Sequence, residues 1–474
     1  MTEHPRPRPG FAKARRIVRR TGWGLADQAF SSLTNFVLGV MIARSVPPHD
    51  FGAFSLAFAT YTLFLGLSRA LTSEPLVVRF SHSSPEAWRA ATAAGTGTAT
   101  LLGVVGGVGC VVFGLATSGP IAQAFIALGV TMPGLLLQDA WRYAFFARGG
   151  GAQAFLNDVI WALVMFPAVA VLIATHQTSM TWLTLGWGGA GAVAGLVGVL
   201  QARVRPRPAL ATAWFRAQRE LASRYLGEFS AMSGARQLSF YAVGAIAGLA
   251  AAGAIRGSQI LLGPIQVLQN GVRLVAIPEA VRLAKTSARR MRAACNLLSA
   301  GLSAVGFLGG LVVYFLPNAV GEQLLGRTWP PAHAVAIPMG LMFAGGGIST
   351  GAIVGLRALA ASERSFAARL IVSVLQVVAT IGGAFLGGAV AAAWGLAIGV
   401  WAGIPIWHWQ LRTAAAEREG HAAVAEPLVP GRVEGIAVPA AGHEADTGSA
   451  QPHAAQPIPA HPTFPPPMQV RQER

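Results

Sequence analysis

Charged and amide side chains interrupt several long apolar runs of this 474-residue sequence, and they are the residues that could bind a substrate. An ionised side chain at the centre of a bilayer costs at least about 2.5 to 3.5 kcal/mol on insertion scales, so it usually faces a cavity or a partner. The set is basic on balance, and a guanidinium presents a fork of donors that matches phosphate oxygens, which favours an anionic substrate. The candidate substrate-binding and translocation residues are Asp27, Gln28, Asn35, Arg69, Glu74, Arg79, Asp139, Arg142, Arg236, Gln269, Asn270, Arg273, Glu279 and Arg282.

The spacing of these residues predicts which of them meet. Asp27 and Asn35 are separated by two intervals of four residues, or about two helical turns, so they share one face of a helix. Arg69 lies in the next apolar run, about as far from the cytoplasmic surface as Asp27, and we expect these two residues to approach each other. Asp139 and Arg142 stand at i and i+3, a spacing at which side chains can pair on a helix surface.

A structural role is a second interpretation of the same charges. Arginines near the cytoplasmic ends of runs, such as Arg79 and Arg282, can form internal ion pairs or extend to the membrane interface. For Arg69, Arg236 and Arg273, which lie deeper in their runs, we favour a role in a cavity.

Enzymatic chemistry has little support in the sequence. The two cysteines, Cys110 and Cys295, lie in or beside apolar runs, and the ten histidines show no metal-binding spacing. A membrane glycosyltransferase would need a paired acidic metal motif in a loop, and none is present. We expect no catalytic residues, no metal and no cofactor.

The composition points to a membrane protein. Hydrophobic residues make up 53% of the chain and charged residues only 12%, against roughly a quarter in a soluble domain. The net charge of +17 would suggest nucleic-acid binding in a soluble chain. In an apolar chain it indicates basic cytoplasmic loops instead, so membrane lipid is the expected partner and nucleic acid is not.

Runs of about 20 apolar residues predict twelve transmembrane helices, because a bilayer core is about 30 Å thick. Pro75 and Pro278 are expected to end the second and eighth of these helices. The predicted spans are 23–43, 52–72, 91–115, 121–141, 154–175, 180–201, 228–249, 254–277, 294–316, 334–356, 367–387 and 390–410.

The distribution of basic residues orients these spans. Every second connection is rich in arginine, whereas the alternate connections offer only Arg44, Arg256 and Arg327. Basic residues are retained on the cytoplasmic side, so both termini are expected in the cytoplasm of a multi-pass protein of the cell membrane. The expected organisation is a basic arm (1–22), a first six-helix bundle (23–201), a basic linker (202–227), a second six-helix bundle (228–410) and a disordered tail (411–474).

An ungapped offset of 203 residues aligns the two predicted bundles. It places the segment from Pro75 to Arg79 on the segment from Pro278 to Arg282. Because six spans separate the copies, the two halves run in the same direction across the membrane and are related by an axis along its normal. Halves of this kind enclose a central cavity that can open to either side.

The first spans resemble a known transporter family. Asp27-Gln28-Ala29 with Asn35, the segment from Glu74 to Arg79, and the segment from Gln138 to Arg148 are similar to the start and the fourth span of polysaccharide flippases. These flippases form a branch of the multidrug/oligosaccharidyl-lipid/polysaccharide exporter superfamily.

The resemblance implies an all-α, polytopic membrane protein with about twelve transmembrane helices in two six-helix bundles, a MATE-like fold. It also implies transport of a polyprenyl-diphosphate-linked oligosaccharide from the cytoplasmic to the outer leaflet by alternating access, for polysaccharide and cell-envelope biosynthesis. A polysaccharide polymerase or glycosyltransferases are candidate partners. Asp27 is a candidate for coupling to an ion or proton, and a static partner for Arg69 is its alternative role.

Two other functions stay open at this point. An ion-coupled exporter of cationic small molecules, of the multidrug type, would need an acidic cavity. A transporter-like membrane scaffold would recruit partners through the long C-terminal tail.

Overall fold

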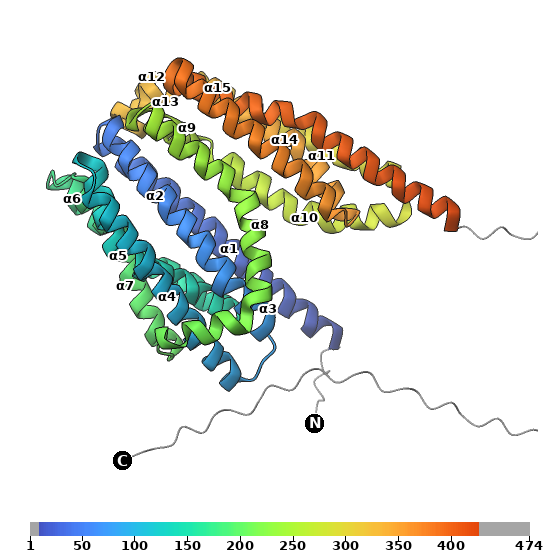
Figure 1. The fold of residues 1–474 in the computed structure, drawn as a ribbon, viewed down its shortest axis with the longest axis horizontal. Helices are drawn as coiled ribbons and strands as arrows, with labels where there is room; N and C mark the ends of the chain where they lie inside the picture. Colours follow the sequence, from blue (N-terminus) through green and yellow to red (C-terminus); the bar gives the residue numbers. More distant parts are fainter. Residues whose placement is uncertain (1–8, 426–474) are drawn as a thin grey trace, which may run out of the picture. The chain divides into compact units, whose positions relative to one another are not determined.

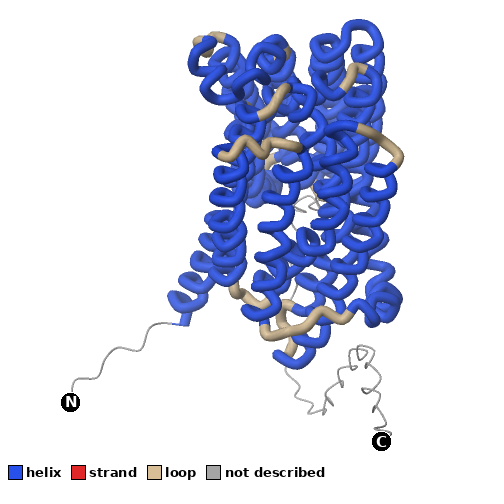
Figure 2. The backbone as a smooth tube through the Cα atoms, turned by 90° about the vertical axis from the view of Figure 1, so that its left-hand side faces the viewer, coloured by secondary structure: helices blue, strands red, loops and turns tan. Residues whose placement is uncertain are grey.

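The computed structural model describes residues 9–425, and within them every regular element is a helix (Figures 1 and 2). The start of the predicted basic arm and the predicted tail beyond residue 425 lie outside the described residues. The helices are α1 (Pro9–Ser45), α2 (Pro48–Ser68), the π-helix η1 (Arg69–Ser73), α3 (Glu74–Phe80), α4 (Pro85–Leu115), α5 (Gly119–Ala147), α6 (Gly151–Ala174), α7 (Met180–Ala202), η2 (Pro208–Leu210), α8 (Ala211–Ile246), α9 (Leu249–Leu261), α10 (Gly263–Thr286), α11 (Ala288–Tyr314), α12 (Asn318–Leu325), η3 (Gly326–Thr328), α13 (Trp329–Ala334), α14 (Ala336–Ala358) and α15 (Ser362–Ala425).

Nine of the described helices are long and apolar enough to cross a membrane, or ten if α9 and α10, bent by 57°, form one span. Two features explain why this number is below twelve. The helix α15 is interrupted by non-helical dihedral angles at Gly387 and Gly388, so it comprises two helices. The helix α8 is not apolar enough to be counted, although it covers most of the predicted span 228–249. With these helices counted, each predicted span coincides with a helix, and the all-α polytopic fold is confirmed.

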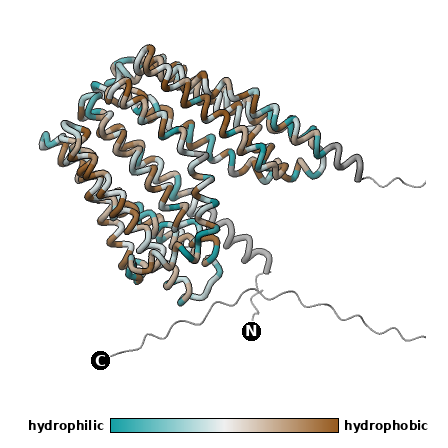
Figure 3. Tube along the Cα trace, in the orientation of Figure 1, coloured by the Kyte–Doolittle hydropathy of each residue, from teal (hydrophilic) through white to brown (hydrophobic). Residues whose placement is uncertain are grey.

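Exposed apolar stripes show where these helices would meet lipid. Val105, Val108 and Val112 of α4 are 63%, 58% and 60% exposed, and their spacing places them on one face. Figure 3 shows hydrophobic residues along most of the length of the helices. The protein is therefore a multi-pass membrane protein, because so much exposed apolar surface would be unfavourable in water.

Local sequence explains several helix ends. Prolines occupy the first turns of α2, α4 and α5, where the missing N–H leaves no hydrogen bond unmade. Ser84 caps α4 by accepting a hydrogen bond from the backbone N–H of Ala87 at 3.3 Å.

Two predicted helix ends are wrong. The second span continues past Pro75 to Phe80, and α10 continues past Pro278 to Thr286. In the first case the π-helical turn Arg69–Ser73 directly precedes the proline. Such a turn widens the backbone, so the chain accommodates the proline without breaking the span.

The last helix also extends beyond the predicted boundary at residue 410 and ends at Ala425. The added residues are rich in alanine, glutamate and arginine, which are strong helix formers. The predicted tail therefore begins with helix.

The chain packs as two halves, α1–α7 and α8–α15. In the first half α5 packs against α4 and α7, and α1 packs against α6. In the second half α14 packs against α11, α10 and α15. Trp187 is fully buried against Phe54, Phe58 and Tyr61, so aromatic packing fixes α7 on α2 in the first half.

The halves contact each other through α1 and α2 against α9, α12 and η3, and through α8 against η1, α2 and α4. Gly52 of α2 lies so close to the Leu249 carbonyl that a Cβ atom there would overlap it. The Thr328 hydroxyl donates to the Ala43 carbonyl at 3.2 Å. The Gly52 and Thr328 contacts both lie at the ends of the helices that the charge pattern predicts to face the outside of the cell. We call these ends the outer end.

Candidate substrate cavity and buried ion-pair network

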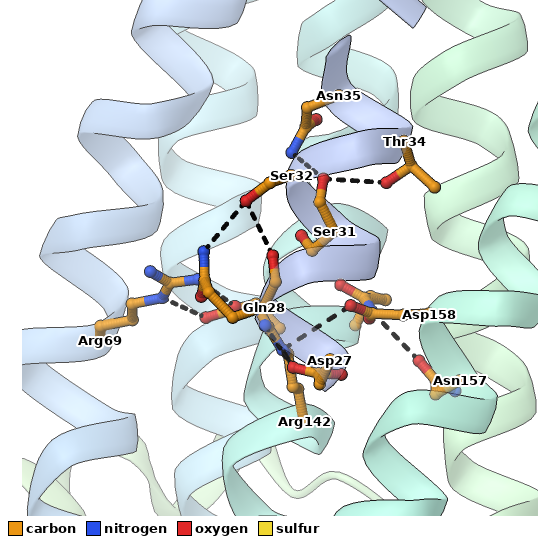
Figure 4. A network of polar contacts seen from close by, with 12 residues as sticks. Asp27, Gln28, Ser31, Ser32, Thr34, Asn35, Arg69, Arg142, Asn157 and Asp158 are labelled. Carbon is orange, nitrogen blue, oxygen red and sulfur yellow. Dashed lines mark hydrogen bonds and ion pairs between the residues drawn. The ribbon is translucent and has the colours of Figure 1, made fainter. Parts of the chain in front are cut away.

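The structure separates the predicted site residues into two groups. Asp27, Arg69, Asp139 and Arg142, together with Asp158, form a buried ion-pair network inside the first half (Figure 4). Asn35, Arg236, Gln269 and Arg273 line a cavity between the halves.

Arg69 forms one part of the network. Its Nε and Nη2 atoms donate to the two carboxylate oxygens of Asp139 at 2.9 and 2.6 Å. The guanidinium also lies 5.3 Å from the centre of the Tyr143 ring. A bidentate pair of this kind fixes both side chains, and it joins η1 to α5.

Arg142 forms the other part. Its Nε atom donates to Asp27 Oδ2 at 2.6 Å and lies 3.7 Å from Asp158 Oδ2. Both contacts are drawn as dashed lines in Figure 4. Gln138 donates to Asp158 at 2.7 Å and to Asn157 at 3.2 Å. Helices α1, α5 and α6 are thereby connected through buried polar groups.

The network contains more carboxylates than arginines. Asp27, Asp139 and Asp158 face Arg69 and Arg142, which leaves one excess negative charge when all are ionised. The Asp27 Oδ1 atom is buried and has no hydrogen-bond partner among the described residues. An unpaired buried carboxylate oxygen is costly unless a proton or cation joins it.

The ion pairs differ from those that the spacing predicted. Asp27 interacts electrostatically with Arg69, as expected, but it forms its ion pair with Arg142, and Asp139 forms its ion pair with Arg69. Residues at i and i+3 point about 60° apart around a helix axis. Asp139 therefore faces η1 and Arg142 faces α1 and α6, where each finds an opposite charge.

The cavity has a volume of about 910 Å³ and is lined by α1, α2, α8, α9, α10, α14 and α15. Most of its wall is apolar, with Phe58, Phe240, Phe343 and Trp407 among the lining residues. It therefore offers apolar surface and a few polar groups together, as binding sites for amphiphilic ligands do.

Four arginines line this cavity, and no aspartate or glutamate is among the described lining residues. Arg273 donates to Asn270 Oδ1 at 2.7 Å, and Arg369 lies 5.6 Å from the Trp407 ring. Arg256 lies 4.8 Å from the Phe58 ring. No ion pair to any of the four is found within residues 9–425, so their charges are available to an anion.

Three residues of these two groups, Arg256, Arg369 and Asp158, were not predicted from the sequence. Arg256 was assigned to an outer connection, but it lies two turns inside α9 and lines the cavity. Arg369 and Asp158 were not candidates, because each lies near the start of its helix, where interfacial charges are common. The only indication in the sequence was a polar residue one helical turn further along, such as Gln259 after Arg256 and Ser373 after Arg369.

The other candidates lie outside both groups. Gln28 is exposed and contacts Ser32 at 3.5 Å (Figure 4). Arg79 donates to the Ala217 carbonyl at 2.8 Å, which joins α3 to α8. Glu279 and Arg282 form an exposed ion pair at 3.3 Å on α10, typical of a solvated helix surface.

Glu74 is partly buried at the start of α3. It lies where η1 and α3 meet α8, where Glu228 of α8 repels its carboxylate and Arg69 attracts it. It therefore belongs to the contact between α3 and α8.

Comparison with solved structures finds several proteins with a similar fold. A multidrug resistance MATE family transporter of the MOP superfamily, in an inward-facing conformation, matches with a TM-score of 0.61 and 13% identity, over 82% of this chain and 95% of that one. The lipid II flippase MurJ, inward closed, matches with a TM-score of 0.64 and 11% identity, over 84% and 90%. A MATE crystallised with MaL6 matches with a TM-score of 0.52 and 14% identity, over 85% and 97%.

No protein-family model and no curated protein sequence matches the chain. The structural matches show the fold that the sequence resemblance implied. The described helices have a MATE-like fold.

Proposed function

We propose that this protein moves a polyprenyl-diphosphate-linked oligosaccharide from the cytoplasmic to the outer leaflet of the cell membrane. The observation that carries the proposal is the cavity between the halves, which has four arginines and no carboxylate among its described lining residues. A diphosphate is strongly repelled by the bilayer centre, and arginines that stay charged compensate for its lost hydration. The apolar remainder of the wall suits the hydrocarbon next to the headgroup.

The contacts between the halves support alternating access. The halves are in backbone contact at the outer end, through Gly52 and Leu249, whereas the cavity lies further along the helices. This arrangement corresponds to a state closed to the outside. Transport requires that this contact separate and that the opposite ends approach, with the two states of similar free energy.

The ion-pair network has two roles in this proposal. It holds α1, η1, α5 and α6 together as one rigid part, because each arginine binds a carboxylate on another helix. Asp27, with its unpartnered Oδ1 atom, is the candidate site for a coupling proton or ion. The network contributes no residue to cargo binding.

Export of a cationic small molecule is a second candidate function. The match to a multidrug resistance transporter and the buried carboxylates of the first half favour it. The carboxylates are engaged by Arg69 and Arg142, however, and the cavity is basic. A cation would be repelled from that cavity, so the anionic cargo fits better.

The test is mass spectrometry of lipid-linked glycans in a strain lacking this gene, with membranes probed from each side. The proposal expects a polyprenyl-diphosphate glycan to accumulate on the cytoplasmic side and to disappear when the wild-type gene returns. The Arg236→Ala and Arg273→Ala variants should insert normally without clearing it. Normal export in the strain, with drug efflux lost instead, would support the second candidate.

A further inference from the structure

The arginines of the cavity form two groups. Arg256 interacts electrostatically with Arg236. Arg369 interacts with Arg273, and both interact with Arg357 at the end of α14.

The helix geometry places these groups at different depths. Arg256 lies two turns from the outer end of α9, whereas Arg273 lies in the middle of α10, beyond the 57° bend. At 1.5 Å per residue their Cα atoms are roughly 20 Å apart. One diphosphate is only a few ångströms long, so it reaches Arg256 and Arg273 together only where both side chains extend toward it.

The outer group has the features of a built site. Arg236 and Ser239 stand at i and i+3 on α8, and Arg256 and Gln259 stand at i and i+3 on α9. All four line the cavity. Ser239 is 2% exposed, and its hydroxyl has no hydrogen-bond partner within the described part of the chain. A buried hydroxyl without a partner is costly, and a bound phosphate oxygen would satisfy it.

The inner group is held in place by its neighbours. Arg273 donates to the side chain of Asn270 and lies 3.5 Å from the Gln269 carbonyl. Gln269 in turn donates to the Phe343 carbonyl at 3.0 Å. The guanidinium of Arg369 lies over the Trp407 ring. Arginines positioned in this way lose little freedom when a ligand binds.

We propose that the cavity holds two separate phosphate-binding sites, an inner site with Arg273 and Arg369 and an outer site with Arg236, Ser239 and Arg256. This inference rests on the proposed function. The diphosphate of the cargo binds first at the inner site and then at the outer site. Two sites of similar affinity divide the crossing into two shorter steps, so neither site holds the cargo too tightly to release it.

The test is isothermal titration of the purified full-length protein in nanodiscs with geranyl diphosphate, a soluble probe that carries no sugar. Wild type should bind two molecules. Arg236→Gln/Arg256→Gln should bind one, and so should Arg273→Gln/Arg369→Gln, with the remaining affinity unchanged within about twofold. Glutamine keeps a polar side chain of comparable length, and a melting curve checks that each variant folds.

The matched control is Arg216→Ala/Arg219→Ala, which removes the same charge from exposed positions of α8 outside the cavity and should bind two molecules. Ser239→Ala should weaken the outer site only. One molecule in wild type, abolished by either glutamine pair, would show a single composite site and overturn the proposal, as would no binding. Two bound molecules in a protein whose deletion strain accumulates no glycan lipid would refute the proposed cargo and leave the two sites standing.

Discussion

Arg142 of α5 donates a hydrogen bond to Asp27 of α1, with 2.6 Å between Nε and Oδ2, and the same guanidinium faces Asp158 of α6. One arginine thus faces carboxylates from two other helices. Its side chain is 12% exposed and those of the two aspartates 1% and 7%, so the charges are largely withdrawn from solvent. Such a group stabilises the fold only while it is complete.

Removing Arg142 should destabilise the first half strongly. Arg142→Ala leaves two buried carboxylates without their cation, which costs about 3 to 5 kcal/mol when one partner of a buried pair is lost. The melting temperature of the purified protein should fall by several degrees. Arg282→Ala is the control, because its ion pair with Glu279 is exposed on both sides and contributes at most about 1 kcal/mol. Equal melting temperatures for the two variants would contradict this role of Arg142.

The pairing of Arg69 with Asp139 can be tested by double-mutant cycles. Arg69→Ala and Asp139→Asn should be strongly non-additive in the free energy of unfolding, with a coupling of about 0.5 to 3 kcal/mol. The cycle of Arg69→Ala with Asp27→Asn should give a smaller coupling, since these residues share no ion pair. A larger coupling between Arg69 and Asp27 would restore the pairing that the sequence suggested.

The contact between Gly52 and Leu249 should hold the outer end closed. Gly52→Ala places a Cβ atom against the Leu249 carbonyl and should separate α2 from α9 there, because overpacking a tight contact costs about 1 to 3 kcal/mol. The readout is labelling of Ser32→Cys, a cavity position, by a membrane-impermeant maleimide added from outside. Cys110 and Cys295 are replaced by serine in this background.

Labelling from outside should rise several-fold in Gly52→Ala. The matched control is Gly109→Ala, whose added methyl group meets no atom within 4 Å. Labelling that stays at the control level would show that this contact does not close the cavity.

Removal of residues 426–474 separates a transporter from a scaffold. A transporter whose cargo site is formed by α1 to α15 should keep most of its export activity after truncation at Ala425. The truncation spares the ion pair between Arg364 and Glu417, which fastens the last helix. Loss of export in a truncated protein that still melts like wild type would favour recruitment through the tail.

The sequence predicted the helices well because transmembrane spans have a strong compositional signal. Arg236 and Arg273 were placed in a cavity correctly, since a charge deep in an apolar run has few other locations. Arg256 was misplaced because a basic residue two turns from a helix end resembles an interfacial one.

The partners of Asp27 and Asp139 depend on rotations of about 60° around a helix axis, which spacing along one helix does not reveal. The passage of the second span through Pro75 depends on a π-helical turn, for which the sequence carries no marker. Relations between helices were therefore the part that only the structure could supply.

Transport of a lipid-linked diphosphate through the arginine-lined cavity can be measured in liposomes that contain the purified protein and the polyprenyl-diphosphate glycan extracted from the deletion strain. A membrane-impermeant glycosidase added outside measures how fast cargo from the inner leaflet becomes accessible. Wild type should make nearly all of the cargo accessible, whereas Arg236→Gln/Arg256→Gln should leave only the outer-leaflet fraction. Equal rates in protein-free liposomes, wild type and the variant would contradict the account.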